Sequence, residues 1–230
     1  GEEVMNLLHD IIAAKGFENE PFFEIAKHEL PMLPKLEGTV HVNMALIVKF
    51  LANYFFNPKE YPEIARRDDA CNDAFLFNQG PTKGLGKIQF HDYKIAYDSV
   101  DLPNVNLFKK QIELFKQFLV KAAPNDRQSE DIDYLLALGE ILTIVGYGQL
   151  IIESRKYFPV SDDLLEEIFD FMVRDFSKFA LNLHMKPSNS DRQRELTLRI
   201  IQSPVPDAER FGRLWTEQVY ALKGAYKMRD

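Results

Sequence analysis

The residues best suited to chemistry form a short acidic turn near the start of the chain, Leu36-Glu37-Gly38-Thr39. A carboxylate acts as a general base when it is held within reach of the proton it removes. Gly38 frees the backbone for a turn, and the Thr39 hydroxyl is suited to cap the apolar helix expected from residue 40. Glu37 is therefore predicted to lie just before a helix N-terminus. A surface carboxylate that interacts with the helix dipole is the plain alternative for this position.

The elements on either side of this turn should hold it in place. Pro31 and Pro34 precede it, and proline fixes its own φ and biases the preceding residue away from the α region, so an extended approach is predicted. The helix that follows, over 40–55, is apolar over much of its circumference and has Lys49 as its charged residue. Such a helix is expected to be packed on several sides.

Other candidate motifs are weaker. The glycine-rich stretch 80–88 exceeds the spacing of a Walker loop by one residue, and Ile88 stands where Ser or Thr would bind magnesium, so a simple turn is favoured. Cys71 has no evident activating base. Glu166-Glu167 is interpreted as a solvated pair on a helix face. The histidines lack partners at metal-ligand spacing, and no metal site is predicted.

Composition limits the classes of function. The chain has 230 residues, a formal charge of −7 and 46% hydrophobic residues, enough for a sizeable core. No basic stripe is present to neutralise a phosphate backbone, so a nucleic-acid partner is not expected. The single cysteine indicates a reducing, cytoplasmic compartment. No secretory signal is visible, and because the chain does not begin with Met, a longer parent protein is expected.

The hydrophobic periodicity predicts an all-α protein built as an antiparallel helical bundle. The apolar window 134–152 has nearly the length of a membrane span, but it contains Glu140 and Gln149, so we interpret it as a buried central helix and expect no transmembrane segment. Ser161 and Asp207 are predicted helix caps. Helices are expected over 3–15, 21–30, 40–55, about 104–123, about 130–158, 162–185, 191–201 and from 207 onward, with short ones near 60–67 and 69–77.

Three regions are predicted from this pattern: residues 1–57 with the Glu37 turn, an ordered connecting segment over 58–98, and a helical-bundle extension over 99–230. Gly139, Gly146 and Gly148 within one long helix reduce its intrinsic stability by about 1 kcal/mol each relative to Ala. Close approach of neighbouring helices is the expected compensation, and a ligand pressed against the backbone is the lesser alternative.

The stretch Pro34-Lys35-Leu36-Glu37-Gly38-Thr39-Val40-His41-Val42-Asn43 resembles the Glu-Gly-Thr segment of flavin-dependent acyl-CoA dehydrogenases. The order of elements is also similar: short helices precede the motif, an apolar helix follows it, and the later helices resemble the C-terminal extension of very-long-chain acyl-CoA dehydrogenases. The resemblance covers residues 1 to about 57 as the end of the dehydrogenase domain and the rest as that extension.

The resemblance implies a C-terminal portion of an FAD-dependent enzyme that oxidises acyl-CoA to trans-2-enoyl-CoA. By the same resemblance, Glu37 is the base that removes the α-proton, Gly38 contacts the substrate, and Thr39 approaches the flavin dinucleotide. His41 falls where many members have Gln, so its cofactor contact departs from the family pattern.

The family's other domains, which supply most of the flavin and acyl-CoA site, have no counterpart in this sequence, so the chain alone is expected to retain little or no FAD. An electron-transfer acceptor and a homo-oligomeric enzyme are expected. The alternative is a non-catalytic helical module for oligomerisation or docking.

Overall fold

The computed structural model describes residues 2–14, 21–36, 38–60 and 88–224. They belong to two compact units, Gly1–Leu46 and Ile47–Asp230. The described residues form helices and turns without a strand, which confirms the predicted all-α class. The short helices expected near 60–67 and 69–77 lie outside the described residues, apart from Glu60.

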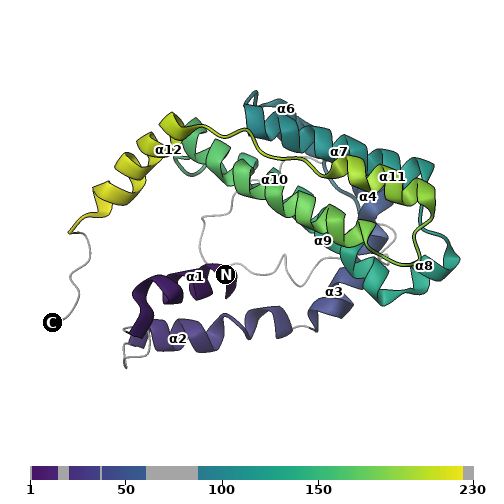
Figure 1. The fold of residues 1–230 in the computed structure, drawn as a ribbon, viewed down its shortest axis with the longest axis horizontal. Coiled ribbons are helices and arrows are strands. Elements are labelled where there is room, and N and C mark those ends of the chain that lie inside the picture. The colour runs from purple at the N-terminus through teal and green to yellow at the C-terminus, as the bar shows by residue number, and fades with distance from the viewer. Residues whose placement is uncertain (1, 15–20, 37, 61–87, 225–230) are drawn as a thin grey trace, which may run out of the picture. The chain divides into compact units, whose positions relative to one another are not determined.

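The first unit contains two helices and a short 3-10 turn before the predicted site (Figure 1). These are α1 (Glu2–Ile12), α2 (Pro21–Glu29) and η2 (Leu33–Lys35), followed by α3 (Val40–Ile47). The apolar residues of α1 recur at helical spacing along one face, but none of its residues is buried. The amphipathic pattern therefore predicted the helix correctly, although its apolar face remains exposed within the described structure.

The approach to the turn differs from the prediction. Pro34 lies in the first turn of η2, where the Lys35 N–H donates to the Met32 carbonyl at 2.9 Å and the Leu36 N–H to the Leu33 carbonyl at 3.4 Å. The φ that proline imposes suits the first turn of a helix as well as an extended chain. The prediction of an extended approach is wrong because the local 3-10 hydrogen bonds decide between these two conformations.

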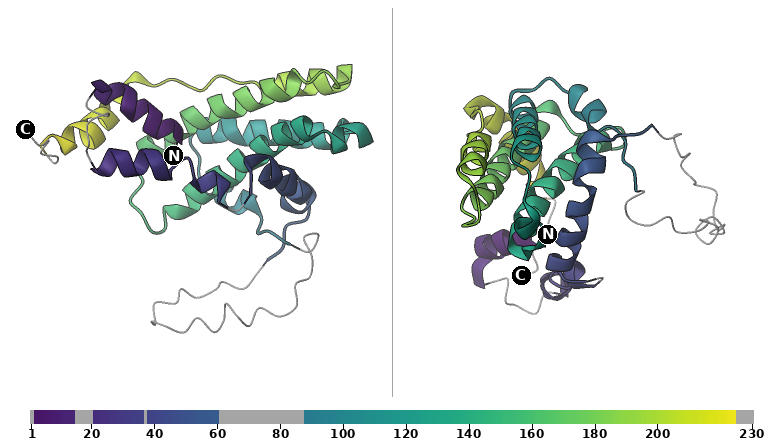
Figure 2. Two further views of the ribbon diagram at one scale, coloured as in Figure 1. Left: turned by 90° about the horizontal axis from the view of Figure 1, so that it is seen from below. Right: turned by 90° about the vertical axis from the view of Figure 1, so that its right-hand side faces the viewer.

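The second unit begins with η3 (Val48–Phe50) and α4 (Leu51–Phe56), continues with α6 (Tyr93–Asp98), and is then built from longer helices (Figures 1 and 2). The long predicted helix over 40–55 is thus divided into three pieces. Its first piece, α3, has no buried residue, whereas α4 buries Leu51, Tyr54 and Phe55. The expected packing on several sides holds for α4 but not for α3.

The bundle is formed by α7 (Pro103–Lys121), α9 (Ile132–Ser154), α10 (Asp162–His184) and α11 (Asp191–Ile200). Helix α10 packs against each of the other three, and α11 also packs against α7, so their apolar faces enclose one core (Figures 1 and 2). The chain ends, within the described residues, with α12 (Ala208–Leu214), a π turn (Trp215–Val219) and a 3-10 turn (Tyr220–Leu222).

Side-chain caps set the helix boundaries. The Ser161 hydroxyl accepts the Leu164 N–H at 3.2 Å, and the Asp207 carboxylate accepts the Arg210 N–H at 3.0 Å, so both predicted caps are confirmed. The helix predicted from about residue 130 to 158 is present as α9, which begins at Ile132 and ends at Ser154, and a short helix that was not predicted, α8 (Asp126–Glu130), precedes it. Asp131 separates them because its backbone is extended and its carboxylate caps α9.

Helix α9 is long and apolar enough, by length and composition, to cross a membrane. In this structure it packs against α10, α6 and η3, and Tyr134, Ile141 and Val145 are among its fully buried residues. The apolar residues of α9 therefore pack into the core of the bundle, in agreement with its interpretation as a buried central helix.

The glycines of α9 differ in what surrounds them. A Cβ at Gly148 would lie 2.5 Å from the Tyr97 hydroxyl and 2.9 Å from the Met172 methyl group, so the expected close approach of helices occurs here. A Cβ at Gly146 would meet no atom within 4 Å. Gly146 is therefore not explained by packing within the described structure.

Alanine at these two positions should change stability in opposite directions. We expect Gly148→Ala to lower the free energy of unfolding by about 1–2 kcal/mol, because overpacking costs more than the gain in helix propensity. Tyr97 cannot move freely, since its hydroxyl donates to the Val145 carbonyl at 2.7 Å. Gly146→Ala should raise the free energy of unfolding by about 0.5–1 kcal/mol. Urea denaturation of both variants provides the measurement, and shifts of the same sign would contradict this account of the two glycines.

Candidate functional site

The predicted site is a tight turn at the start of α3. Glu37 itself lies outside the described residues, but the residues after it are defined. Gly38 has a φ of +118°, a backbone conformation that residues other than glycine rarely adopt. The Thr39 hydroxyl accepts the Val42 N–H at 3.3 Å, and the Thr39 carbonyl accepts the Asn43 N–H at 3.1 Å. The predicted glycine turn and threonine cap are therefore both present.

Asn43 is a component of this turn that the sequence interpretation missed. Its Oδ1 lies 3.4 Å from the position that a Cβ on residue 38 would occupy. A side chain at residue 38 would thus be strained by the positive φ, and its Cβ would be in van der Waals contact with Asn43. Helical spacing could have suggested this neighbour, because residues three to four positions into a helix face back toward its first turn.

Thr39 and His41, the predicted cofactor contacts, are both exposed on the first turn of α3. The Thr39 hydroxyl keeps its proton available as a donor, because in its cap it acts as an acceptor. One hydroxyl and one imidazole can contribute to flavin binding, but they do not form a complete FAD site.

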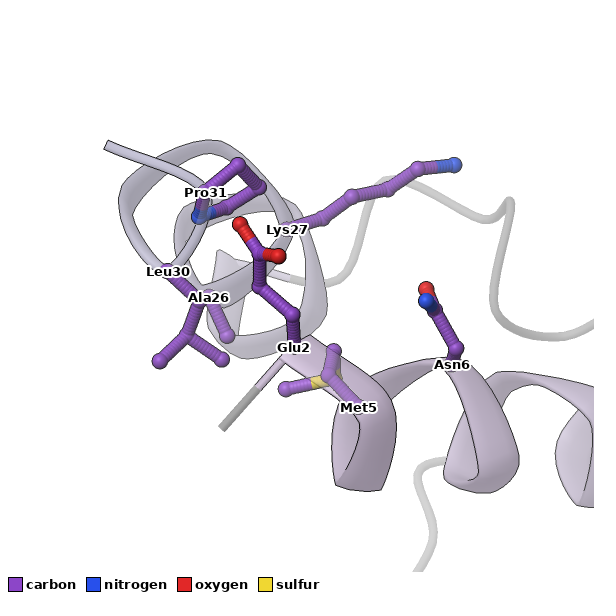
Figure 3. A pocket seen from close by; sticks show the side chains of 7 residues that line it. All are labelled: Glu2, Met5, Asn6, Ala26, Lys27, Leu30 and Pro31. Carbon is purple, nitrogen blue, oxygen red and sulfur yellow. The ribbon is translucent and has the colours of Figure 1, made fainter. Parts of the chain in front are cut away.

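A separate pocket of about 340 Å³ opens between α1 and α2 (Figure 3). Helix α1 contributes Glu2, Met5 and Asn6. Ala26 and Lys27 of α2 and the following Leu30 and Pro31 form the other side. The Glu2 carboxylate reaches toward Leu30 and Pro31, whereas the Lys27 side chain extends away from it (Figure 3). Gly38, Thr39 and His41 are not part of this lining, so the pocket is distinct from the predicted site.

The second unit has an open groove of about 490 Å³ with an almost entirely apolar lining. One wall consists of Ile47, Phe50 and Tyr54, and Ile88 and Phe90 lie beside it. Helix α9 supplies the opposite wall with Leu142, Thr143, Gly146, Tyr147 and Leu150.

Aromatic packing fixes the first wall of the groove: the Phe90 ring meets the Phe50 and Tyr54 rings edge-on at centroid distances of 5.8 and 5.5 Å. Sequence reasoning did not find this groove, because its walls come from segments far apart in the chain.

The Tyr54 hydroxyl beside the groove belongs to a chain of side-chain hydrogen bonds. The Tyr54 hydroxyl donates to the Gln149 Oε1 at 2.7 Å, and the Gln149 amide donates to Glu153 at 2.8 Å. Burial raises the pKa of Tyr54 far above its ordinary value, so the phenol remains neutral. The groove therefore offers apolar contact and no charged group of its own.

Among the described residues, no group of three or more His, Cys, Asp or Glu side chains is arranged to hold a metal ion. Glu166, predicted to be solvated, is buried instead and pairs with Arg210 at 3.2 Å. Its partners are all protein groups that join α10 to neighbouring segments, which indicates a structural role. Comparison with protein-family models, curated proteins and solved structures found no match to this chain.

Proposed function

We propose that this chain is the C-terminal portion of a flavin-dependent acyl-CoA dehydrogenase, with an acyl-CoA dehydrogenase C-terminal-domain-like fold, and that Glu37 removes the α-proton of an acyl thioester. The observation that carries the proposal is the turn after Glu37. Gly38 has a positive φ and Thr39 caps α3, so the residues after Glu37 form a turn at the start of a helix, within the segment that resembles the family's Glu-Gly-Thr stretch.

The chemistry of the proposal requires a base at a fixed position. The thioester carbonyl acidifies the neighbouring α-carbon, and a carboxylate in contact with that C–H can accept its proton as enolate-like charge develops on the carbonyl oxygen. Gly38 has no side chain to obstruct a substrate beside the turn. A bound acyl chain would exclude water from Glu37, and desolvation of a carboxylate raises its pKa and makes it a stronger base.

FAD is the oxidant that the resemblance implies, and acyl-CoA and an electron-transfer acceptor are the implied partners. The Thr39 hydroxyl and the His41 imidazole are the groups of this chain that we propose lie near the cofactor. Because they form only an edge of a flavin site, we propose that FAD is held mainly by other parts of the complete enzyme. The role derived for this chain is therefore limited to the proton transfer at Glu37.

Replacing the proposed base provides the test. In the complete enzyme, Glu37→Gln should lower the rate of acyl-CoA oxidation by about 10²–10⁴-fold, because the amide cannot accept the α-proton. Exchange of the substrate's α-hydrogen with deuterium from the solvent should fall in parallel, and this readout reports proton removal directly. Glu24→Gln, which changes the same charge on the exposed surface of α2, is the matched control and should be near normal. Near-normal oxidation and exchange by Glu37→Gln would refute the assignment.

Oligomerisation or docking is a second candidate function, and a different observation favours it. Phe211, Trp215 and Tyr220 are exposed on the C-terminal helical segment, where the Trp215 ring lies 6.0 Å from each of the other two ring centroids. Clustered exposed aromatic side chains are common at protein interfaces. Sedimentation equilibrium of this chain should then show self-association that Trp215→Glu weakens. A strict monomer at all concentrations would argue against self-association by this surface.

A further inference from the structure

The apolar groove between α9 and the segment 47–54 presents a feature that protein packing leaves unexplained. Gly146 lines the groove, is half-buried, and has no atom within 4 Å of the position of a Cβ. Glycine within a helix is unfavourable relative to alanine. At Gly148, two residues further along α9, the absence of a side chain makes room for Tyr97 and Met172. At Gly146 it instead leaves the helix backbone accessible from the groove.

The lining determines which ligands can be held. None of the lining residues that the structure describes is Asp, Glu, Lys, Arg or His. The Tyr54 hydroxyl already donates to Gln149, and the other lining hydroxyls belong to Thr143 and Tyr147. A charged ligand would lose its hydration in this groove without gaining a charged partner, which is unfavourable. An apolar ligand loses no such interactions and gains contact with Phe50, Phe90 and Leu150.

The size of the groove favours a small molecule over a protein partner. Its ten lining residues fall well short of the ~20–30 residues per side of a stable protein interface. Its volume of about 490 Å³ lies within the range of small-molecule sites, about 300–1,000 Å³.

The groove is also elongated. Leu142, Gly146 and Leu150 follow one another at every fourth position, and they span about 12 Å along α9. Ile47, Phe50 and Tyr54 form a comparable row on the opposite wall.

We propose that this groove binds an uncharged, unbranched hydrocarbon chain, which lies along α9 in contact with the backbone at Gly146. The polar end of the ligand, where it has one, remains at the solvent-exposed edge of the groove, because the described lining has no charged group to bind it. The proposed occupant is the alkyl part of a single amphiphilic molecule. This inference is independent of the role proposed for Glu37, since the groove lies wholly in the second unit.

Displacement of a fluorescent apolar dye tests the proposal with this chain. Nile red should bind with enhanced emission, and 1-octanol, 1-decanol and 1-dodecanol should displace it. Because each buried methylene strengthens binding about fourfold, successive alcohols should differ by about 16-fold in affinity while the groove can accommodate them. Displacement that does not depend on chain length would overturn the proposal.

Two glycine substitutions locate the site. Gly146→Leu places a side chain in the groove and should weaken dodecanol binding at least tenfold. Gly212→Leu is the matched control, because Gly212 is also helical with no atom within 4 Å of its Cβ position, but it lies on α12 outside the groove. It should bind dodecanol as the unsubstituted chain does. Equal binding by the two variants would overturn the proposal.

Sedimentation and circular dichroism, measured on the same samples, separate this inference from its alternatives. Both variants should retain the helical spectrum and the oligomeric state of the unsubstituted chain. If Gly146→Leu dissociates an oligomer that Gly212→Leu preserves, the groove is a protein interface and the proposal is wrong. If the chain binds phosphatidylcholine vesicles but the alcohols do not displace Nile red, the apolar surface serves a lipid bilayer and the proposal is likewise wrong.

Discussion

Glu166→Leu is expected to lower the free energy of unfolding of the second unit by about 3 kcal/mol, the lower end of the range for breaking a buried ion pair, because Arg210 keeps Glu167 as a second ion-pair partner at 3.4 Å. Glu166 and Arg210 are only 4% and 5% exposed. The carboxylate accepts from Arg210 Nη1 at 3.2 Å and from the Asn104 backbone N–H at 2.8 Å. The leucine variant therefore removes the nearer of two carboxylates that pair with Arg210, and it also removes a cap at the start of α7.

A double variant distinguishes this mechanism from a simple loss of packing. Glu166→Leu/Arg210→Leu should be more stable than Glu166→Leu alone, because it removes the buried guanidinium that the single change leaves with Glu167, at 3.4 Å, as its remaining ion-pair partner among the described residues. Arg213→Ala is the control on the same helix, since Arg213 forms an exposed bidentate pair with Asp163 and should matter far less. Chemical denaturation with a fitted m-value gives the free energy of unfolding of all three variants. A loss below about 1 kcal/mol for Glu166→Leu would contradict burial of the pair.

The Glu166 network joins segments that are distant in the sequence. Asn104 at the start of α7 donates to Glu166 through its backbone and side chain, and its Oδ1 accepts the Val205 N–H at 2.7 Å. Arg210 adds the first turn of α12. The sequence pattern showed Glu166-Glu167 only as an acidic pair on a helix. Its burial depends on where α7 and α12 pack, and local periodicity carries no information about that packing.

The features that sequence predicted well depend on near neighbours. Ser161 and Asp207 were identifiable as caps because a cap bonds amides two or three positions away. Asp131 shows the limit of this reasoning. Residues 125–131 are polar and carry no apolar periodicity, so α8 was not predicted, and the extended backbone of Asp131 separates α8 from α9.

The same distinction applies to the candidate sites. Gly38 and Thr39 could be interpreted from their types, and the positive φ and the cap followed as predicted. The groove could not be found in this way, because Phe90 and Gly146 become neighbours of Phe50 only through the tertiary fold. The glycine pattern of α9 gave a partial signal. It indicated that something approaches the helix closely, but only the structure separates Gly148, which contacts protein, from Gly146, which faces the groove.

Phe108→Ala should destabilise the second unit by about 3–5 kcal/mol, the range for truncation of a fully buried phenylalanine. Phe108 is 0% exposed and lies among three aromatic rings. Its ring stacks on Tyr97 at a centroid distance of 5.9 Å and meets Phe169 and Phe176 edge-on at 5.3 and 5.2 Å. The variant would lose these aromatic contacts and leave a cavity between α7 and α10, because rigid neighbouring rings cannot close the space.

Phe171→Ala is the matched control, because it removes the same side chain from the exposed face of α10. Phe171 is 59% exposed and contacts the Arg174 guanidinium, so its loss should cost about 1 kcal/mol or less. Thermal and urea unfolding should therefore separate the two alanine variants by at least 2 kcal/mol. Phe108→Leu should fall between them, since it refills most of the cavity without restoring the ring contacts. Equal losses for Phe108→Ala and Phe171→Ala would mean that the aromatic core does not hold α7 and α10 together.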